Sequence, residues 1–180
     1  SDLLVTGAKV VTLNSGSFEN STAANHGGAL YCASSAADSA ATVSGTSFKN
    51  CSTTLSNGDG GAIYANGGTL TLKNAEDKTA VKIDGCMTST ANGAVGRGGA
   101  VYMNAGVLNV TENTVISACY ADKGGAIYLP AGVTMNITDS PEFSQNGFTS
   151  VNGRTVDASE GACLYLSEDG RIILSGSPKF

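Results

Sequence analysis

The chain has 180 residues and a formal net charge of −5, a length that suits one domain, predicted to span residues 1–180. Its acidic balance argues against a nucleic-acid partner, which would need clustered Lys and Arg side chains, and no apolar run approaches the ~20 residues of a membrane-spanning helix. Because 41% of the residues are apolar and recur in a pattern, we expect a packed core rather than disorder.

Five segments along the chain share the pattern Gly-Gly-Ala-aliphatic-Tyr, which is degenerate in the last copy. They occupy residues 27–31, 60–64, 98–102, 124–128 and 161–165. The copies recur at intervals of roughly 26 to 38 residues, so loops of variable length must connect a constant structural unit.

Two further apolar patterns follow each copy. A Gly-containing turn leads to an alternating strand, whose apolar residues are Val11/Leu13, Val43, Leu70/Leu72, Leu108/Val110, Met135/Ile137 and Ile172/Leu174. One large apolar residue comes next: Phe18, Phe48, Ile83, Ile116, Phe143 and Phe180. Three short strands per repeat predict an all-β fold, a right-handed single-stranded parallel β-helix of about five coils.

Period-2 alternation excludes helical repeats, which need a 3.6-residue period. It also assigns faces within the Gly-Gly-Ala strand, where Ala and Tyr should point outward. Leu30, Ile63, Val101 and Ile127 should point inward and stack in one buried column, ~4.8 Å apart. Neither end shows a cap, so we expect the chain to be part of a longer array, flanked by further coils of the same chain.

The Gly-Gly-Ala-aliphatic strands and the Phe-x-x-Asn segments resemble the passenger domains of bacterial polymorphic outer membrane proteins. Residues 143–146 read Phe-x-x-Asn as written, whereas Ser21, Cys51, Cys86 and Cys119 replace the Asn of the other copies. The resemblance implies an autotransporter-type adhesin at the cell surface or outer membrane, or secreted, that binds a host-cell protein or a glycan.

The tyrosines of the repeat should form one outward column: Tyr31, Tyr64, Tyr102, Tyr128 and Tyr165. One interpretation is a stripe that binds a sugar or a protein, centred on Tyr64, Tyr102 and Tyr128. The other is a structural ladder, in which stacked aromatic pairs contribute ~0.5–1.5 kcal/mol each beyond the burial of area. The ladder is favoured, because every coil carries the Tyr, whereas a binding site usually interrupts a repeat.

Cys51, Cys86 and Cys119 fall in a second column, close enough between neighbouring coils for one disulfide. The plainer interpretation is that each Cys fills a tight buried position as a small apolar residue. Because no two of the five cysteines have CxxC spacing and His26 is the only histidine, we expect no metal site.

Charged residues precede the Gly-Gly step: His26, Asp59 (shifted by one), Arg97, Lys123 and Glu160. The loops that lead to this step vary most in length. Loops 87–97 and 147–160 should flank the short loop 120–123 as two walls around a groove, and Arg97, Lys123 and Arg154 would make that groove positive. Such a groove would bind an anionic or polar group of a partner; the alternative is that the loops are solvated connectors.

A β-helix enzyme is the main competing hypothesis. Hydrolysis of a glycosidic bond needs two facing carboxylates, about 5–9.5 Å apart, and the acids here fall mostly in turns, with no pair on neighbouring strands. We therefore expect a non-enzymatic binding domain with no catalytic residues and no cofactor. A carbohydrate-active or glycan-binding β-helix is the first alternative, and a structural spacer is the second.

Overall fold

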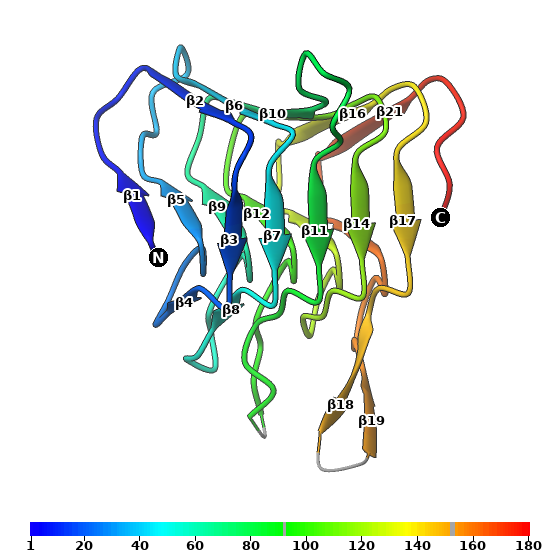
Figure 1. The fold of residues 1–180 in the computed structure, drawn as a ribbon. Helices are drawn as coiled ribbons and strands as arrows, with labels where there is room; N and C mark the ends of the chain where they lie inside the picture. The colour runs from blue at the N-terminus through cyan, green and yellow to red at the C-terminus, as the bar shows by residue number, and fades with distance from the viewer. Residues whose placement is uncertain (92, 152–153) are drawn as a thin grey trace.

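Three parallel β-sheets run along a stack of coils in the computed structural model, which describes residues 1–91, 93–151 and 154–180 (Figure 1). The first sheet contains β1 (Leu3–Val5), β5 (Leu30–Cys32), β9 (Ile63–Ala65), β12 (Val101–Met103), β15 (Ile127–Leu129) and β20 (Leu164–Leu166). The second contains β2 (Val10–Asn14), β6 (Ala40–Ser44), β10 (Thr69–Lys73), β13 (Val107–Val110), β16 (Thr134–Ile137) and β21 (Arg171–Leu174).

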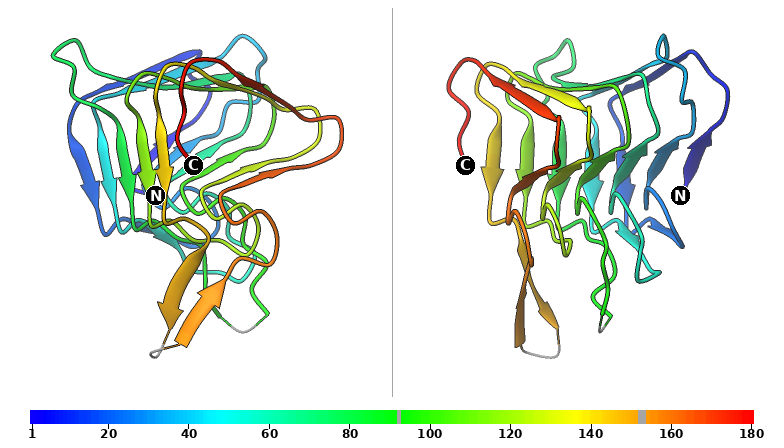
Figure 2. Two further views of the ribbon diagram at one scale, coloured as in Figure 1. Left: turned by 90° about the vertical axis from the view of Figure 1, so that its right-hand side faces the viewer. Right: turned by 180° about the vertical axis from the view of Figure 1, so that it is seen from behind.

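The third sheet contains β3 (Ser17–Glu19), β7 (Ser47–Lys49), β11 (Lys82–Asp84), β14 (Val115–Ser117) and β17 (Glu142–Ser144). Each coil takes one strand from every sheet in turn, and the view along the stack superposes the coils (Figure 2). The expected parallel β-helix is therefore the fold of this chain. The described residues include no helix.

The first and second sheets each have six strands, one more than the number of Gly-Gly-Ala copies. The additional strand of the first sheet is β1, in which Leu3 pairs with Leu30 and follows Ser1 and Asp2, where the motif has Gly and Ala. An aliphatic strand can occupy this place without the motif, because the register comes from the pairing of strands and not from the turn alone.

The core is built from columns of like residues, as predicted. Leu30, Ile63, Val101 and Ile127 are paired in register and fully buried. In the third sheet Phe18 and Phe48 stack with their ring centroids 5.2 Å apart. In-register pairing of similar strands stacks residues of the same type on one another. Apolar side chains from every coil therefore fill the core.

The prediction that the alanine of the motif points outward is wrong. Ala29, Ala62, Ala100 and Ala126 are fully buried and belong to the core. Alternation of faces holds only within extended backbone, and the first-sheet strands begin at the aliphatic residue, after a turn at the glycine pair. The tyrosine does lie outside this core, but in a covered cluster rather than in open solvent.

Both glycines of the pair are required by the backbone, the first by its positive φ and by steric contact, and the second by steric contact with the next coil. The first glycine is left-handed in every copy, and Gly98, with φ +66, would place a Cβ 2.2 Å from the carbonyl oxygen of Val101. A Cβ on Gly99 would lie 2.2 Å from the carbonyl oxygen of Gly125 in the next coil. No side chain fits at either position, which explains the Gly-Gly step of the first four copies; the fifth copy keeps only the first glycine and has Ala162 at the second position.

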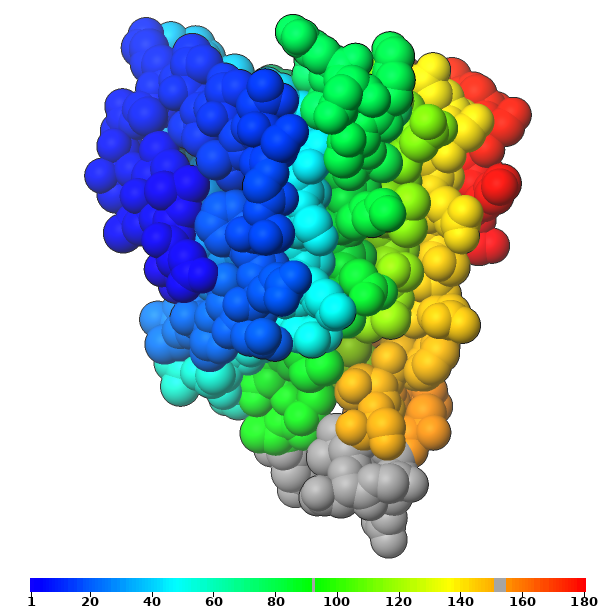
Figure 3. Space-filling model, in the orientation of Figure 1, coloured from blue at the N-terminus to red at the C-terminus, as the bar shows by residue number. Residues whose placement is uncertain are grey.

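Loops of unequal length leave one edge of the stack, where the third sheet connects back to the first. We call this edge the loop edge. Two segments project furthest from it: loop 87–97, and an antiparallel hairpin of β18 (Phe148–Val151) and β19 (Arg154–Asp157) (Figures 1 and 3). At the N-terminal end of the same edge lies a short ladder formed by β4 (Thr22–Ala23) and β8 (Ser52–Thr53).

Candidate functional site

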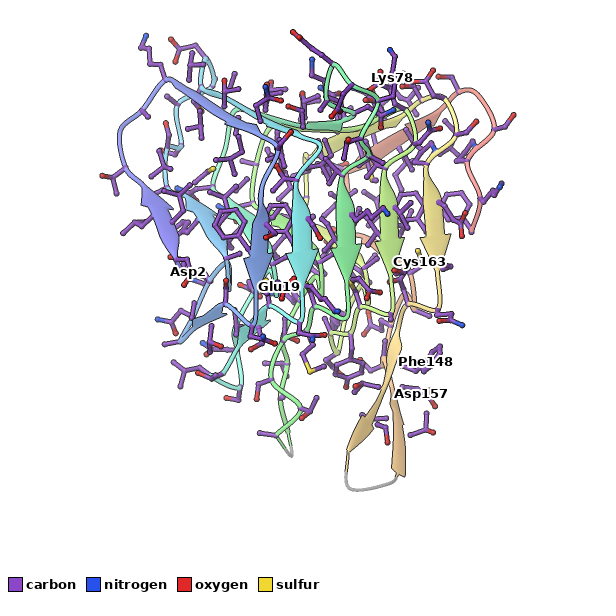
Figure 4. The ribbon with its side chains drawn as sticks, viewed as in Figure 1. Asp2, Glu19, Lys78, Phe148, Asp157 and Cys163 are labelled. Atoms are coloured by element: carbon purple, nitrogen blue, oxygen red, sulfur yellow. The ribbon has the colours of Figure 1, made fainter. Side chains whose placement is uncertain are left out.

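Loop 87–97 and the hairpin stand on either side of the short loop 120–123, and enclose a cleft of about 460 Å³ that we call the hairpin groove. Its lining residues are Thr90, Ala91, Gly93, Ala94, Tyr120, Asp122, Val156 and Asp157. The walls and the floor therefore come from the segments that the sequence predicted. The hairpin forms one wall of the groove. In it Phe148 pairs with Asp157, and the ring of Phe148 is exposed (Figure 4).

The charged side chains that line the hairpin groove are Asp122 and Asp157, not the expected cations. Arg97 and Lys123 line a different cleft, which shares no lining residue with the hairpin groove, and the side chain of Arg154 lies outside the described residues. Asp122 and Lys123 are consecutive, and Asp122 lines the hairpin groove whereas Lys123 lines the other cleft.

Tyr120 forms the floor of the hairpin groove and is almost fully buried. Burial, and then the negative charges of Asp122 and Asp157, raise the pKa of its phenol. Both carboxylates therefore lie within electrostatic reach of one hydroxyl group. This arrangement was not predicted from the sequence, because segment 147–160 was expected to be a loop. A signal was present: alternating residues flank an Asn-Gly pair at 152–153, a pattern typical of β-hairpins.

The second cleft, which we call the Arg97 cleft, has a volume of about 430 Å³. It is lined by His26, Asn57, Asp59, Val95, Arg97, Lys123 and Tyr128. Isolated parallel β-bridges pair the backbone of His26 with that of Asp59, Asp59 with Arg97, and Arg97 with Lys123. The charged column is thus continuous and in register, without the shift that was expected at Asp59.

Asp59 and Arg97 form the central ion pair of this column. The Nε and Nη2 groups of Arg97 donate hydrogen bonds of 2.8 and 2.7 Å to the two carboxylate oxygens of Asp59. The Asp59 side chain is only 3% exposed, whereas that of Arg97 is 37% exposed. The hydrogen bonds to Asp59 raise the pKa of the guanidinium, so Arg97 stays charged.

The tyrosines stack beside the charged column. Centroid distances along the series Tyr64, Tyr102, Tyr128 and Tyr165 are 5.1, 5.4 and 4.7 Å, and Tyr31 meets Tyr64 edge-on. The guanidinium of Arg97 lies 4.8 Å from the ring centre of Tyr102 and 5.3 Å from that of Tyr128. Such cation–π contacts cover the ring faces.

Tyr64, Tyr102 and Tyr128 are therefore buried and offer little surface to a partner. Of these three residues, only Tyr128 lines the Arg97 cleft. The geometry favours the ladder over the binding stripe, because each ring is enclosed by its neighbours and by charged side chains.

The thiols of Cys51, Cys86 and Cys119 are buried and free. The backbone N–H of Cys51 donates to Sγ of Cys86 at 3.3 Å, and that of Cys119 donates to Oδ1 of Asn146 at 3.0 Å. Asn146 belongs to the Phe-x-x-Asn copy. Cys86 and Asn146 thus occupy equivalent positions, and the side chain of each accepts a hydrogen bond from the backbone N–H of the cysteine in the preceding coil. Hydrogen bonding to Cys86 and burial raise the pKa of the Cys51 thiol, which keeps it protonated.

Among residues 1–91, 93–151 and 154–180, no group of three or more His, Cys, Asp or Glu side chains is arranged to hold a metal ion. Within the same part of the chain no helix is long and apolar enough to cross a membrane. No family model, curated protein or solved structure matches the chain. The site must therefore be interpreted from its own geometry.

Proposed function

We propose that this β-helix is a non-enzymatic binding domain, displayed on a cell surface or secreted, that holds a host protein or a glycan at its loop edge. The hairpin groove carries this proposal. The two projecting segments, separated by the short loop 120–123, enclose about 460 Å³, a volume within the range of small-molecule sites. Simple connectors between coils need no such projections, as the short loop 120–123 demonstrates.

The lining of the hairpin groove suits a partner rich in hydroxyl or amino groups. Asp122 and Asp157 accept hydrogen bonds, and Thr90 and the backbone of Gly93 add further polar atoms. Sugar hydroxyls donate to carboxylates in this way, with hydrogen bonds stronger than those between neutral groups. The partner class is therefore a neutral glycan or a cationic segment of a protein. The surface location rests on the resemblance of the repeat to autotransporter passengers.

The decisive experiment removes the hairpin, which forms one wall of the groove, without disturbing the coils. The backbone N–H of Ala158 donates to the carbonyl oxygen of Gly147 at 2.6 Å, so the two ends of the hairpin are adjacent. Replacement of residues 148–157 by two glycines should leave the thermal unfolding midpoint nearly unchanged. Binding to the neutral glycans of an array and to cultured host cells should fall at least tenfold.

Point variants give the matched comparison. Asp122→Asn with Asp157→Asn removes both groove carboxylates, whereas Glu19→Gln removes an exposed carboxylate from the third sheet (Figure 4). Only the first variant should lose binding. Unchanged binding after removal of the hairpin would exclude the groove as the binding site, whereas absence of binding by the unaltered chain would favour the structural spacer.

The carbohydrate-active alternative is favoured by one observation, the presence of two carboxylates in the same groove. A glycosidase uses such a pair as acid and as base or nucleophile. An assay for new reducing ends on the glycans that bind distinguishes the two functions. Release of reducing ends that disappears in the Asp122→Asn variant would establish an enzyme in place of a binding domain.

A further inference from the structure

The Arg97 cleft is separate from the hairpin groove, because no residue lines both. Its volume of about 430 Å³ is in the range of small-molecule sites and far exceeds the space of a single ion. The chemistry of its lining also differs, because it combines two cationic side chains with the imidazole of His26, an amide, an aromatic ring and the carboxylate of Asp59, which is paired with Arg97.

Arg97 is held in one orientation within this cleft. Asp59, behind it, fixes two of the five N–H donors of the guanidinium, and the stacked rings of Tyr102 and Tyr128 support its plane. Among the described residues, the two side-chain hydrogen bonds of Arg97 both go to Asp59. The outer edge of the guanidinium therefore presents preorganised donors to the cleft, with the planar geometry that matches a carboxylate or a sulfate.

Lys123 provides the second cation. Its ammonium group lies 2.8 Å from Glu160, and the side chains of this pair are 32% and 48% exposed. An ion pair in this exposed setting contributes little to stability, so the ammonium group is free to exchange Glu160 for the anionic group of a ligand. Asn57 and Tyr128 add a hydrogen-bonding amide and a ring edge beside the cations, which suits the polar and apolar faces of a sugar.

We propose that the Arg97 cleft binds the acidic group of an anionic saccharide, either the carboxylate of a uronic acid or a sulfate ester. Arg97 binds the anion through two N–H groups, Lys123 neutralises its remaining charge, and Asn57 and Tyr128 contact the sugar ring. The inference belongs to the proposed binding function but uses a different cleft, so loss of the hairpin does not affect it.

The test titrates the whole chain with a galacturonate tetrasaccharide, a heparin-derived hexasaccharide, and a neutral galactan tetrasaccharide. Isothermal calorimetry reports the affinity, and tyrosine emission reports events at the ladder, since the chain has no Trp. One or both acidic saccharides should bind at least tenfold more tightly than the neutral one. Preference between the two acidic saccharides distinguishes a carboxylate site from a sulfate site.

Two variants test the assigned residues. Lys123→Gln should weaken binding of the acidic saccharide at least fivefold, whereas Lys82→Gln, which removes the same charge from an exposed position on the third sheet, should have no effect. The paired variant Asp59→Asn with Arg97→Gln removes the guanidinium without stranding a buried carboxylate, and should abolish binding. The variant without residues 148–157 should bind the acidic saccharide normally.

Three results would overturn the proposal. Equal loss of affinity in Lys123→Gln and Lys82→Gln would show that binding follows net charge rather than this cleft. Equal affinity for acidic and neutral saccharides would remove the role of the anion. Inorganic sulfate at the same affinity as the saccharides would show a simple ion site without recognition of sugar.

Discussion

Asp59 and Arg97 belong to adjacent coils, and their two hydrogen bonds of 2.8 and 2.7 Å connect these coils at the loop edge. His26 approaches the same carboxylate, with its Nδ1 3.8 Å from Oδ2 of Asp59. Because Asp59 is almost fully covered, its negative charge depends on Arg97 for compensation. The pair therefore has a structural role, and it also orients the Arg97 guanidinium.

Loss of Arg97 should destabilise the fold more than loss of both partners. Arg97→Ala strands the Asp59 carboxylate and should cost about 2–3 kcal/mol, somewhat less than a fully buried pair because Arg97 is partly exposed. Asp59→Asn combined with Arg97→Gln should recover most of this loss. Urea unfolding of Asp59→Asn, of Arg97→Gln and of the double variant measures the coupling free energy between the two side chains. Additive effects would show that the pair contributes nothing as a unit.

The tyrosine ladder should stabilise the stack most at its centre. Tyr102 is 3% exposed and stacked on both faces, so Tyr102→Ala should cost about 3–5 kcal/mol, as for other large buried aromatic residues. Tyr165→Ala, at the end of the ladder, should cost about 1 kcal/mol. Tyr102→Phe is the control: it keeps the stacking and loses only the hydrogen bond to Asn104. Equal losses for Tyr102→Ala and Tyr165→Ala in denaturant melts would contradict a central ladder.

Substitution within the glycine pair should be far more damaging than substitution at an open glycine. In Gly99→Ala the new Cβ meets backbone atoms that cannot move alone, and we expect a loss of about 3 kcal/mol or more. Gly132 also has a positive φ, of +77°, but nothing lies within 4 Å of a Cβ there. Gly132→Ala should therefore cost only the left-handed backbone strain, about 1 kcal/mol. Comparison of the two thermal midpoints would show whether steric contact between coils, rather than φ alone, requires the motif.

Alkaline pH should weaken the ladder. Burial raises the pKa of Tyr64 and of Tyr102 to about 12, above the ordinary value of about 10. The fold thus prefers the neutral phenols, so their contribution to stability is complete below about pH 10 and is lost as the pH rises through about 12. Absorbance at 295 nm should show these two groups ionising after ordinary tyrosines, and urea midpoints should fall over the same interval. Simultaneous ionisation of all six tyrosines near pH 10 in folded protein would refute this prediction.

The strand columns could be predicted from the sequence because each depends on local chemistry repeated in every coil. Alternation sets which side of an extended strand is apolar, and in-register pairing of like strands then stacks Ile63 on Leu30 and Tyr102 on Tyr64. The place of loop 87–97 and of segment 147–160 on one edge follows from the same periodicity.

Positions at turns and between loops were decided by the tertiary structure. Ala62 is buried because the backbone bends at the glycine pair, where alternation no longer applies. The tyrosines are covered because charged side chains from a different turn lie over them. Asp122 and Asp157 share a groove only because segment 147–160 folds into a hairpin. A repeat pattern specifies what recurs along the stack, whereas charge at the loop edge depends on contacts between segments that do not repeat.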